Sequence, residues 1–331
     1  MRRVGKISSN IEIVFQHNTI GVNFFGQNMI SFVVPVYRSA QCLPELYSRL
    51  CTEYDLSLNA FEIIFVDDCG GDNSWEVIKA LAAKDPRVRG FLMSRNYGQH
   101  NALLCGIREA LGEIIVTLDD DLQHPPEEIH KLLRQLECGY DVVYGSPYRE
   151  QHGFMRNLAS KVTKMALQVA MGTINAKQVS AFRVFRTNLR DAFSEYWSPT
   201  VNIDVLLTWG TTNFSAIRII HHERKYGNSG YTLSKLTRHA LNMITGFSIL
   251  PLQFASLIGV FFAFVGLFIL TYVLIRWLLE GTVVPGFVFL SSIITIFSGA
   301  QLLALGLIGE YISRIHLRTM KRPPYFVREK L

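Results

Sequence analysis

Residues 113–127 read EIIVTLDDDLQHPPE: an apolar run, three consecutive carboxylates and, after three intervening residues, a proline pair. The run is typical of a buried β-strand, and a helical pattern follows it. Ligands of open α/β sheets bind at the carboxyl ends of strands. Adjacent carboxylates repel one another unless a cation lies among them. The stretch therefore predicts a site for a cation and phosphates at a strand end; an acidic turn that caps the following helix is the alternative.

The same alternation extends along the chain from Met29. It predicts βαβ units and hence an α/β fold with a mostly parallel, doubly wound, Rossmann-like sheet. We expect strands at 30–36, 61–66, 88–93, 113–118 and 141–144, and helices at 43–52, 74–84, 99–111, 127–137 and about 156–169.

Two long stretches without charge follow this region, at 240–275 and 281–308. Each exceeds the roughly 20 residues that cross a bilayer, so a membrane hairpin is favoured over a pair of buried core helices. Basic residues precede and follow the pair, whereas the connection carries only Glu280. The positive-inside rule then places both ends in the cytoplasm. Because these flanks account for much of the net charge of +6, a nucleic-acid partner is not expected.

These patterns divide the chain into five expected segments. They are an N-terminal extension (1–28), a catalytic domain (29–232), a juxtamembrane amphipathic helix (233–247), a two-helix transmembrane hairpin (248–310) and a basic cytoplasmic tail (311–331). A plain helical lead-in to the membrane is the alternative for 233–247. The five cysteines form no CxxC pair, which is consistent with reduced thiols in a cytosolic domain.

A second acidic pair, Asp67-Asp68, closes the expected strand at 61–66. A carboxylate at that place can accept hydrogen bonds from a ribose or a base. The alternative is an N-cap for the helix that begins near Ser74. Neither a GxGxxG after the first strand nor a GxxxxGK[ST] occurs, which disfavours a dehydrogenase or a P-loop NTPase.

Four motifs together carry a family resemblance: VVPVY at 33–37, FVDD at 65–68, SRNYG at 94–98 and DDDLQHPP at 119–126. With them the chain resembles the family 2 glycosyltransferases of the GT-A fold. More narrowly, it is similar to their polyprenyl-phosphate hexosyltransferases, the branch that includes bactoprenol glucosyltransferases and dolichyl-phosphate mannose synthases. The resemblance covers nearly the whole chain from Met29.

The resemblance implies a divalent metal, Mg²⁺ or Mn²⁺, at the acidic cluster. Its ligands would be Asp119, Asp121 and Gln123. On an extended strand end, alternate residues share a face, so Asp119 and Asp121 are expected to point the same way. The nucleotide pocket would be lined by Pro35, Tyr37, Asp68, Arg95, Asp119 and Asp120.

Two further groups would handle the phosphates of donor and acceptor. A loop that closes over the donor diphosphate would use Arg224, Gly227 and Ser229. Arg224 and Asp121 would be the catalytic residues. The alternative for this loop is a basic patch that binds anionic lipid. The acceptor phosphate would meet Arg149, Arg156 and Ser160, of which the last two share a helix face, although a solvated face is the alternative.

Two departures from the family pattern stand out. Pro147 follows Gly145-Ser146 where the family often has Arg, so Arg149 has to substitute. The frequent Thr-Gly-Asp-Phe-Arg motif reads VSAFR at 179–183, so the acid–base role of its Asp does not transfer, while Arg183 is left as a phosphate contact.

The expected function is inverting, metal-dependent transfer of a hexose, glucose from UDP-glucose by preference, to undecaprenyl phosphate. The protein would be a multi-pass enzyme of the bacterial inner membrane with a cytoplasmic catalytic domain. Association of copies through the sparsely packed hairpin is also expected. GDP-mannose or a UDP-aminopentose as donor, or an inactive scaffold for glycan assembly, are the alternatives. A processive polysaccharide synthase is disfavoured because Arg276-Trp277 lacks the Gln of the Gln-x-x-Arg-Trp motif.

Overall fold

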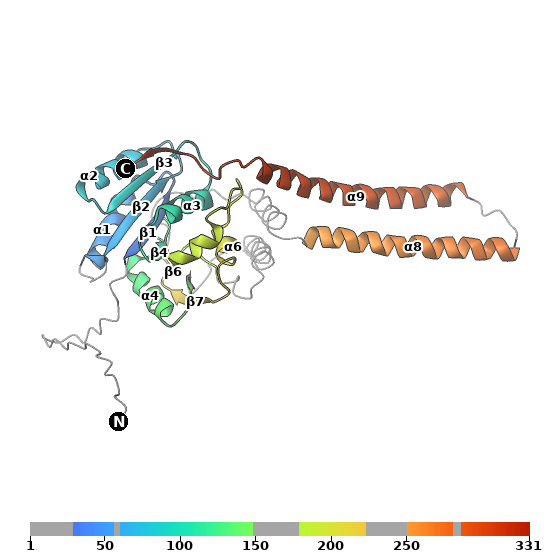
Figure 1. The fold of residues 1–331 in the computed structure, drawn as a ribbon, viewed down its shortest axis with the longest axis horizontal. Helices are drawn as coiled ribbons and strands as arrows, with labels where there is room; N and C mark the ends of the chain where they lie inside the picture. Colours follow the sequence, from blue (N-terminus) through green and yellow to red (C-terminus); the bar gives the residue numbers. More distant parts are fainter. Residues whose placement is uncertain (1–28, 56–59, 148–178, 223–249, 281–285) are drawn as a thin grey trace, which may run out of the picture.

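The computed structural model describes residues 29–55, 60–147, 179–222, 250–280 and 286–331. Within them the chain folds into a sheet domain from which a pair of long helices projects (Figure 1). The strands are β1 (Ile30–Val36), β2 (Phe61–Asp67), β3 (Val88–Met93), β4 (Ile114–Thr117), β5 (Val142–Pro147), β6 (Arg183–Arg186), β7 (Phe214–Ile219) and β8 (Val327–Lys330). The helices are α1 (Leu43–Tyr54), α2 (Ser74–Lys84), α3 (Gln99–Glu109), α4 (Ile129–Glu137), α6 (Ile203–Leu207), α8 (Leu250–Glu280) and α9 (Phe287–Thr319), with 3-10 helices η1 (Pro126–Glu128) and η3 (Thr187–Phe193).

The described strands form one sheet in the order β7-β5-β6-β4-β1-β2-β3-β8. Its centre is parallel, since β1 pairs with β2 and with β4, and β2 pairs with β3. Every residue of β1 and β2 is buried, as expected of strands covered on both faces. Antiparallel pairing appears where β6 joins β4 and where β8 joins β3. The predicted α/β class with a mostly parallel sheet is confirmed.

Helices cover both faces of the sheet with separate hydrophobic layers. Side chains of α1, α2 and α4 pack into one layer, and those of α3, η3 and α6 pack into the other. The helix α3 lies very close to the central strands: a Cβ on Gly106 would come within 2.4 Å of Val33 Cγ1. This close packing holds α3 against β1 and β2.

The two projecting helices match the predicted hairpin in composition. Leu250–Arg276 and Ile296–Thr319 are long and apolar enough to cross a membrane, and neither segment is buried. The helices lie side by side (Figure 1), with Phe262 and Phe297 in edge-to-face contact at 5.7 Å. The segments expected to be an extension (1–28) and an amphipathic helix (233–247) lie outside the described residues.

The chain beyond the hairpin returns to the sheet, which the tail expected at 311–331 did not anticipate. The helix α9 continues to Thr319, and β8 then adds an antiparallel edge strand beside β3. The N–H of Leu331 donates to Gly90 O at 2.9 Å. Four residues, VREK, are too few to show a strand period, and the partner strand lies far away in the sequence.

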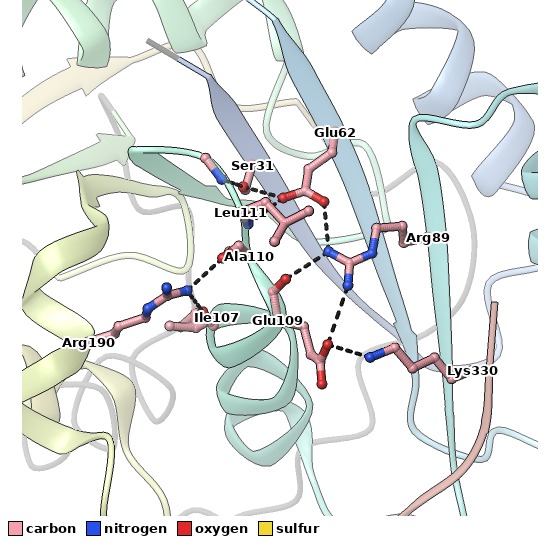
Figure 2. A network of polar contacts seen from close by, with 10 residues as sticks. Ser31, Glu62, Arg89, Ile107, Glu109, Ala110, Leu111, Arg190 and Lys330 are labelled. Atoms are coloured by element: carbon pink, nitrogen blue, oxygen red, sulfur yellow. Dashed lines mark hydrogen bonds and ion pairs between the residues drawn. The ribbon is translucent and has the colours of Figure 1, made fainter.

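A network of charges closes the end of the sheet where the central strands begin (Figure 2). The buried Glu62 accepts from Ser31 Oγ at 2.7 Å and from Arg89 at 2.9 Å. Arg89 also bonds to Glu109, whose carboxylate accepts from Lys330 at 2.7 Å. Residues from β1, β2, β3, α3 and β8 are thus tied together at this end.

Candidate active site

Those predicted site residues that the structure describes lie at the opposite end of the sheet. Because β4, β1, β2 and β3 are neighbours and mutually parallel, their carboxyl ends form one continuous edge. Tyr37 follows β1, Asp68 follows β2, Arg95 follows β3 and the acidic cluster follows β4. Pro35 is buried within β1. The half-exposed Tyr37 and the exposed Arg95, which stacks over the Tyr97 ring at 4.5 Å, lie along this edge.

Asp68 holds the loop between β3 and α3. Its two carboxylate oxygens accept from the backbone N–H groups of Tyr97 at 2.7 Å and Gly98 at 2.8 Å. Gly98 has φ +97°, a conformation that glycine adopts without strain. Burial raises the pKa of Asp68 to about 6, against the effect of the two N–H donors. The capping alternative is wrong for Asp68, because α2 begins after Asn73.

Asp120 joins the acidic cluster to the end of β1. Its carboxylate accepts from the backbone N–H of Tyr37 at 3.0 Å. Burial, together with the charges of Asp119 and Asp121, raises the pKa of Asp120 to about 7, although bonds from Ser39 and Tyr37 oppose the rise. A nearby cation stabilises the ionised form of such a buried carboxyl group more than that of an exposed one.

The acidic cluster lies in a turn and not on an extended strand. The strand β4 ends at Thr117, and Leu122 has φ +61°. The expectation that alternate residues here share a face was therefore based on the wrong backbone conformation. Asp119 accepts from Gln99 Nε2 at 2.6 Å, and Asp121 accepts from the backbone N–H of Gln123 at 3.1 Å. The alternative, that the acidic turn caps the following helix, is also wrong, because no side chain caps η1.

His124 anchors this turn to the rest of the domain. Its ring is buried, stacks on Phe182 at 5.1 Å and meets His221 edge-on at 5.1 Å. Burial lowers the pKa of His124 to about 4, so the ring is neutral near pH 7. The His of the motif is thus explained by its packing, and the two prolines after it are buried as well.

The acidic turn suits a hard divalent cation that is shared with phosphates. The described part of the chain has no cluster of three or more His, Cys, Asp or Glu that would hold a metal by itself. Mg²⁺ commonly uses only one or two carboxylates and completes its shell with substrate phosphates and water. Asp119 and Asp121 fit that donor set, and the backbone of Gln123 is fixed by its bonds to Asp121 and His222.

The VSAFR segment has a different role from the one expected for its arginine. Arg183 is fully buried and forms an ion pair with Asp204, which also accepts from Tyr144 OH at 3.1 Å. Arg183 is therefore a structural residue and not a phosphate contact. The carbonyl of Ala181 accepts from Thr117 Oγ1 at 2.8 Å, so the position of the family's Asp lies beside the end of β4.

Some expected residues cannot be placed, and others were missed. Those outside the described residues are Arg149, Arg156, Ser160, Arg224, Gly227 and Ser229. The sequence reasoning missed Gln99, which holds Asp119, and Ser39, which bonds to Asp120. The position of Gln99, directly after the SRNYG motif at the start of α3, was the available signal.

The sequence model of glycosyl transferase family 2 matches residues 31–197. The chain is a family 2 glycosyltransferase. This assignment confirms the resemblance that the four motifs predicted. The matched region contains the whole carboxyl-end edge, from Tyr37 to the acidic turn.

The alignments to named relatives of this glycosyltransferase include the two long apolar helices as well. It is 36% identical, over 304 residues, to the undecaprenyl-phosphate 4-deoxy-4-formamido-L-arabinose transferases of Yersinia pestis strain Pestoides F and Yersinia pseudotuberculosis serotype O:3. Each alignment covers 91% of this chain and 93% of the relative. These relatives belong to the polyprenyl-phosphate branch.

Solved structures share the fold of the sheet domain. Glucosyl-3-phosphoglycerate synthase from Mycobacterium tuberculosis, in complex with Mn²⁺, UDP and glucosyl-3-phosphoglycerate, superimposes with a TM-score of 0.50 at 17% identity. The match covers 66% of this chain and 78% of the synthase. At this identity the likeness establishes the GT-A fold of the glycosyltransferase and nothing further.

Proposed function

We propose that this glycosyltransferase moves a sugar from a UDP-sugar to undecaprenyl phosphate at the cytoplasmic face of a bacterial inner membrane. The observation that carries the proposal is one acidic, partly buried edge on the same chain as two helices able to cross a membrane. Relatives named as transferases to that lipid, which align over both parts, support the acceptor. Both ends of the hairpin would then lie in the cytoplasm.

The residues of the edge have separate proposed roles. Asp119 and Asp121, with Gln123, hold a divalent metal and the donor diphosphate, and Mn²⁺ in a relative of the same fold supports this choice of ion. Asp68 and Asp120 keep the nucleotide side rigid through backbone bonds at Gly98 and Tyr37. The remaining proposed nucleotide contacts are Pro35, Tyr37 and Arg95. Outside the described residues, the proposed contacts of the donor diphosphate are Arg224, Gly227 and Ser229, and those of the acceptor phosphate are Arg149, Arg156 and Ser160.

The proposed reaction is a single inverting displacement. An oxygen of the acceptor phosphate attacks the anomeric carbon, the bond from that carbon to the donor diphosphate breaks, and UDP leaves with the bonding electrons. The attacking phosphate is already anionic near neutral pH and needs little help from a general base. Ala181, at the position where the family often has Asp, has only a methyl group and offers no general base, which is compatible with an attack that needs none. A bound divalent cation would supply charge stabilisation for the departing diphosphate.

The proposed donor is UDP-4-deoxy-4-formamido-L-arabinose. Relatives bearing that specificity in their names align over nearly the whole chain, whereas the expectation of UDP-glucose has no comparable support. The decisive measurement uses the full chain in vesicles that contain undecaprenyl phosphate and Mg²⁺ or Mn²⁺. Each of UDP-4-formamido-arabinose, UDP-glucose and GDP-mannose is supplied separately, and nucleotide release and glycolipid are measured.

We expect glycolipid with the formamido pentose and at least about tenfold less with UDP-glucose, which is the lower end of the discrimination that a small difference in pocket contacts gives. Preferential glucose transfer would restore the original donor expectation. Absence of nucleotide release with every donor would instead favour an inactive scaffold. Removal of the metal by EDTA is expected to abolish release, and its persistence would contradict the proposed metal site.

A further inference from the structure

The chain leaves the membrane hairpin and joins the catalytic sheet over a very short distance. We call residues 320–331 the strap: a link from the end of α9, followed by β8. The carbonyl of Phe326 accepts from the N–H of Ser94 at 3.0 Å, and that of Pro324 accepts from Asn101 Nδ2. Further along, Glu329 accepts from Trp75 Nε1 at 3.1 Å. The strap is therefore bonded to β3, α2 and α3.

The strap holds the loop that in turn holds the active-site carboxylates. Ser94 begins the loop from β3 to α3, and Asn101 lies in the first turn of α3. Between them, Gly98 donates its N–H to Asp68, and Gln99 bonds to Asp119. A displacement of the strap would therefore act on the nucleotide side of the site through its bonds to the backbone of Ser94 and to the side chain of Asn101.

The end of α9 also lies directly against the catalytic domain. Arg318, in its last turn, lines a cavity of about 370 Å³ together with Tyr196, Trp197 and Trp209. Both tryptophans are half exposed, at 51% each. Exposed tryptophan beside the end of a membrane-spanning helix is typical of a side chain at the lipid interface. The cavity thus lies on the side of the domain next to the end of α9.

The length of the link limits how far the active site can lie from the membrane. The six residue steps from Met320 to Phe326 span at most about 20 Å when fully extended. The other connection between sheet domain and hairpin, residues 223–249, is several times longer. The shorter connection sets the upper limit on the separation.

We propose that the strap is a positioning element for transfer, which keeps the donor side of the site within reach of a phosphate at the membrane surface. The inference rests on the proposed function for its lipid acceptor. A short tether raises the effective concentration of one bound partner near another, and lengthening it lowers that concentration roughly as the −3/2 power of its length. In this proposal the strap acts through its bonds to Ser94 and Asn101 and through the length of the link.

The test lengthens the link and leaves β8 in place. Spacers of about 4, 8 and 16 Gly/Ser residues are inserted between Arg322 and Pro323, which enlarges the six-step link up to nearly fourfold. In the matched controls, the same spacers are appended after Leu331, where they do not change the link. Transfer to undecaprenyl phosphate in vesicles is measured together with UDP affinity in the presence of Mg²⁺.

We expect kcat/KM for the lipid acceptor to fall progressively, to about one seventh with the longest spacer, while UDP affinity stays within about twofold. The appended controls should transfer like the unmodified protein. Equal transfer by all inserted variants would overturn the inference, as would a loss of UDP binding that does not depend on spacer length. If the unmodified protein binds UDP but transfers nothing to this lipid, the proposed function fails and the inference falls with it.

Discussion

The two ends of the central sheet both gather carboxylates, but they neutralise them differently. At the amino end, Glu62 and Glu109 are paired with Arg89, and Lys330 completes the network (Figure 2). At the carboxyl end, Asp68 and Asp120 accept from backbone N–H groups and a hydroxyl, and burial raises both pKa values. Only the second arrangement leaves negative charge that an incoming cation can stabilise.

A buried carboxylate is therefore not by itself evidence of a functional site. Glu62 and Asp68 are equally buried, at 3% exposure each. Glu62 has its counter-charge within the fold, so it contributes rigidity. Asp68 has partners that orient it without neutralising it, which is the arrangement that functional sites need. Removing charge at the two ends should therefore affect different properties.

The largest effect is expected from Asp121→Asn at the carboxyl end. The amide keeps an oxygen for the N–H of Gln123 but removes a charge at the proposed metal site. Transfer should fall by about 10³-fold, with kcat affected most, because metal and diphosphate lose an electrostatic partner in the transition state. Glu137→Gln, at an exposed position on α4, is the control and should retain full activity. Steady-state kinetics with full activity for Asp121→Asn would remove the distinction between the two ends.

At the amino end, Glu62→Ala should reduce stability and spare catalysis. It leaves Ser31 Oγ and the backbone N–H of Leu111 without their buried acceptor and removes one of the two carboxylate partners of Arg89, a change expected to cost about 3 kcal/mol. Thermal unfolding in detergent should show a lowered midpoint. Transfer per folded molecule, measured well below that midpoint, should stay within about twofold of the unmodified protein. A selective fall in kcat without loss of stability would show that this network belongs to the site.

The pH dependence should come from the carboxyl end. Folding raises the pKa of Asp120 from 3.8 to about 7, so between pH 3.8 and about pH 7 the folded protein binds a proton that the unfolded chain does not. The stability of the metal-free fold therefore decreases as the pH rises through this range. Metal and UDP favour the ionised group. Their affinity should therefore drop about tenfold from pH 8 to pH 6, as one proton competes. Titration calorimetry should show a much flatter profile for Asp120→Asn, and an unchanged slope would assign the dependence elsewhere.

The smallest effect is expected from Lys330→Ala. The ion pair with Glu109 is largely exposed, with side-chain exposures of 54% and 35%. Such pairs contribute about 0.5 kcal/mol and are weakened by salt. The unfolding midpoint should shift by only a few degrees at low salt and less at high salt. A larger, salt-independent shift would mean that Lys330 holds β8 to the sheet more strongly than its ion pair indicates.

The sequence alone determined the features whose signals are local. Apolar runs and helical periods predicted β1, α2 and β3 with the bounds that the structure has, and two uncharged stretches predicted the hairpin. The acidic residues and the proline pair after them predicted a site at the carboxyl ends of the strands, because residue types and their spacing are read directly along the chain.

Only the tertiary structure decided which partner each polar group has. The bond from Gln99 to Asp119 and the pair of Arg183 with Asp204 join residues about 20 apart, and β8 pairs with a strand more than 200 residues earlier. No period or motif encodes such contacts, since they arise when separate elements pack and each buried polar group must find a partner. Arg183 illustrates the limit: the motif indicated a phosphate contact, but burial beside Asp204 gave it a structural role.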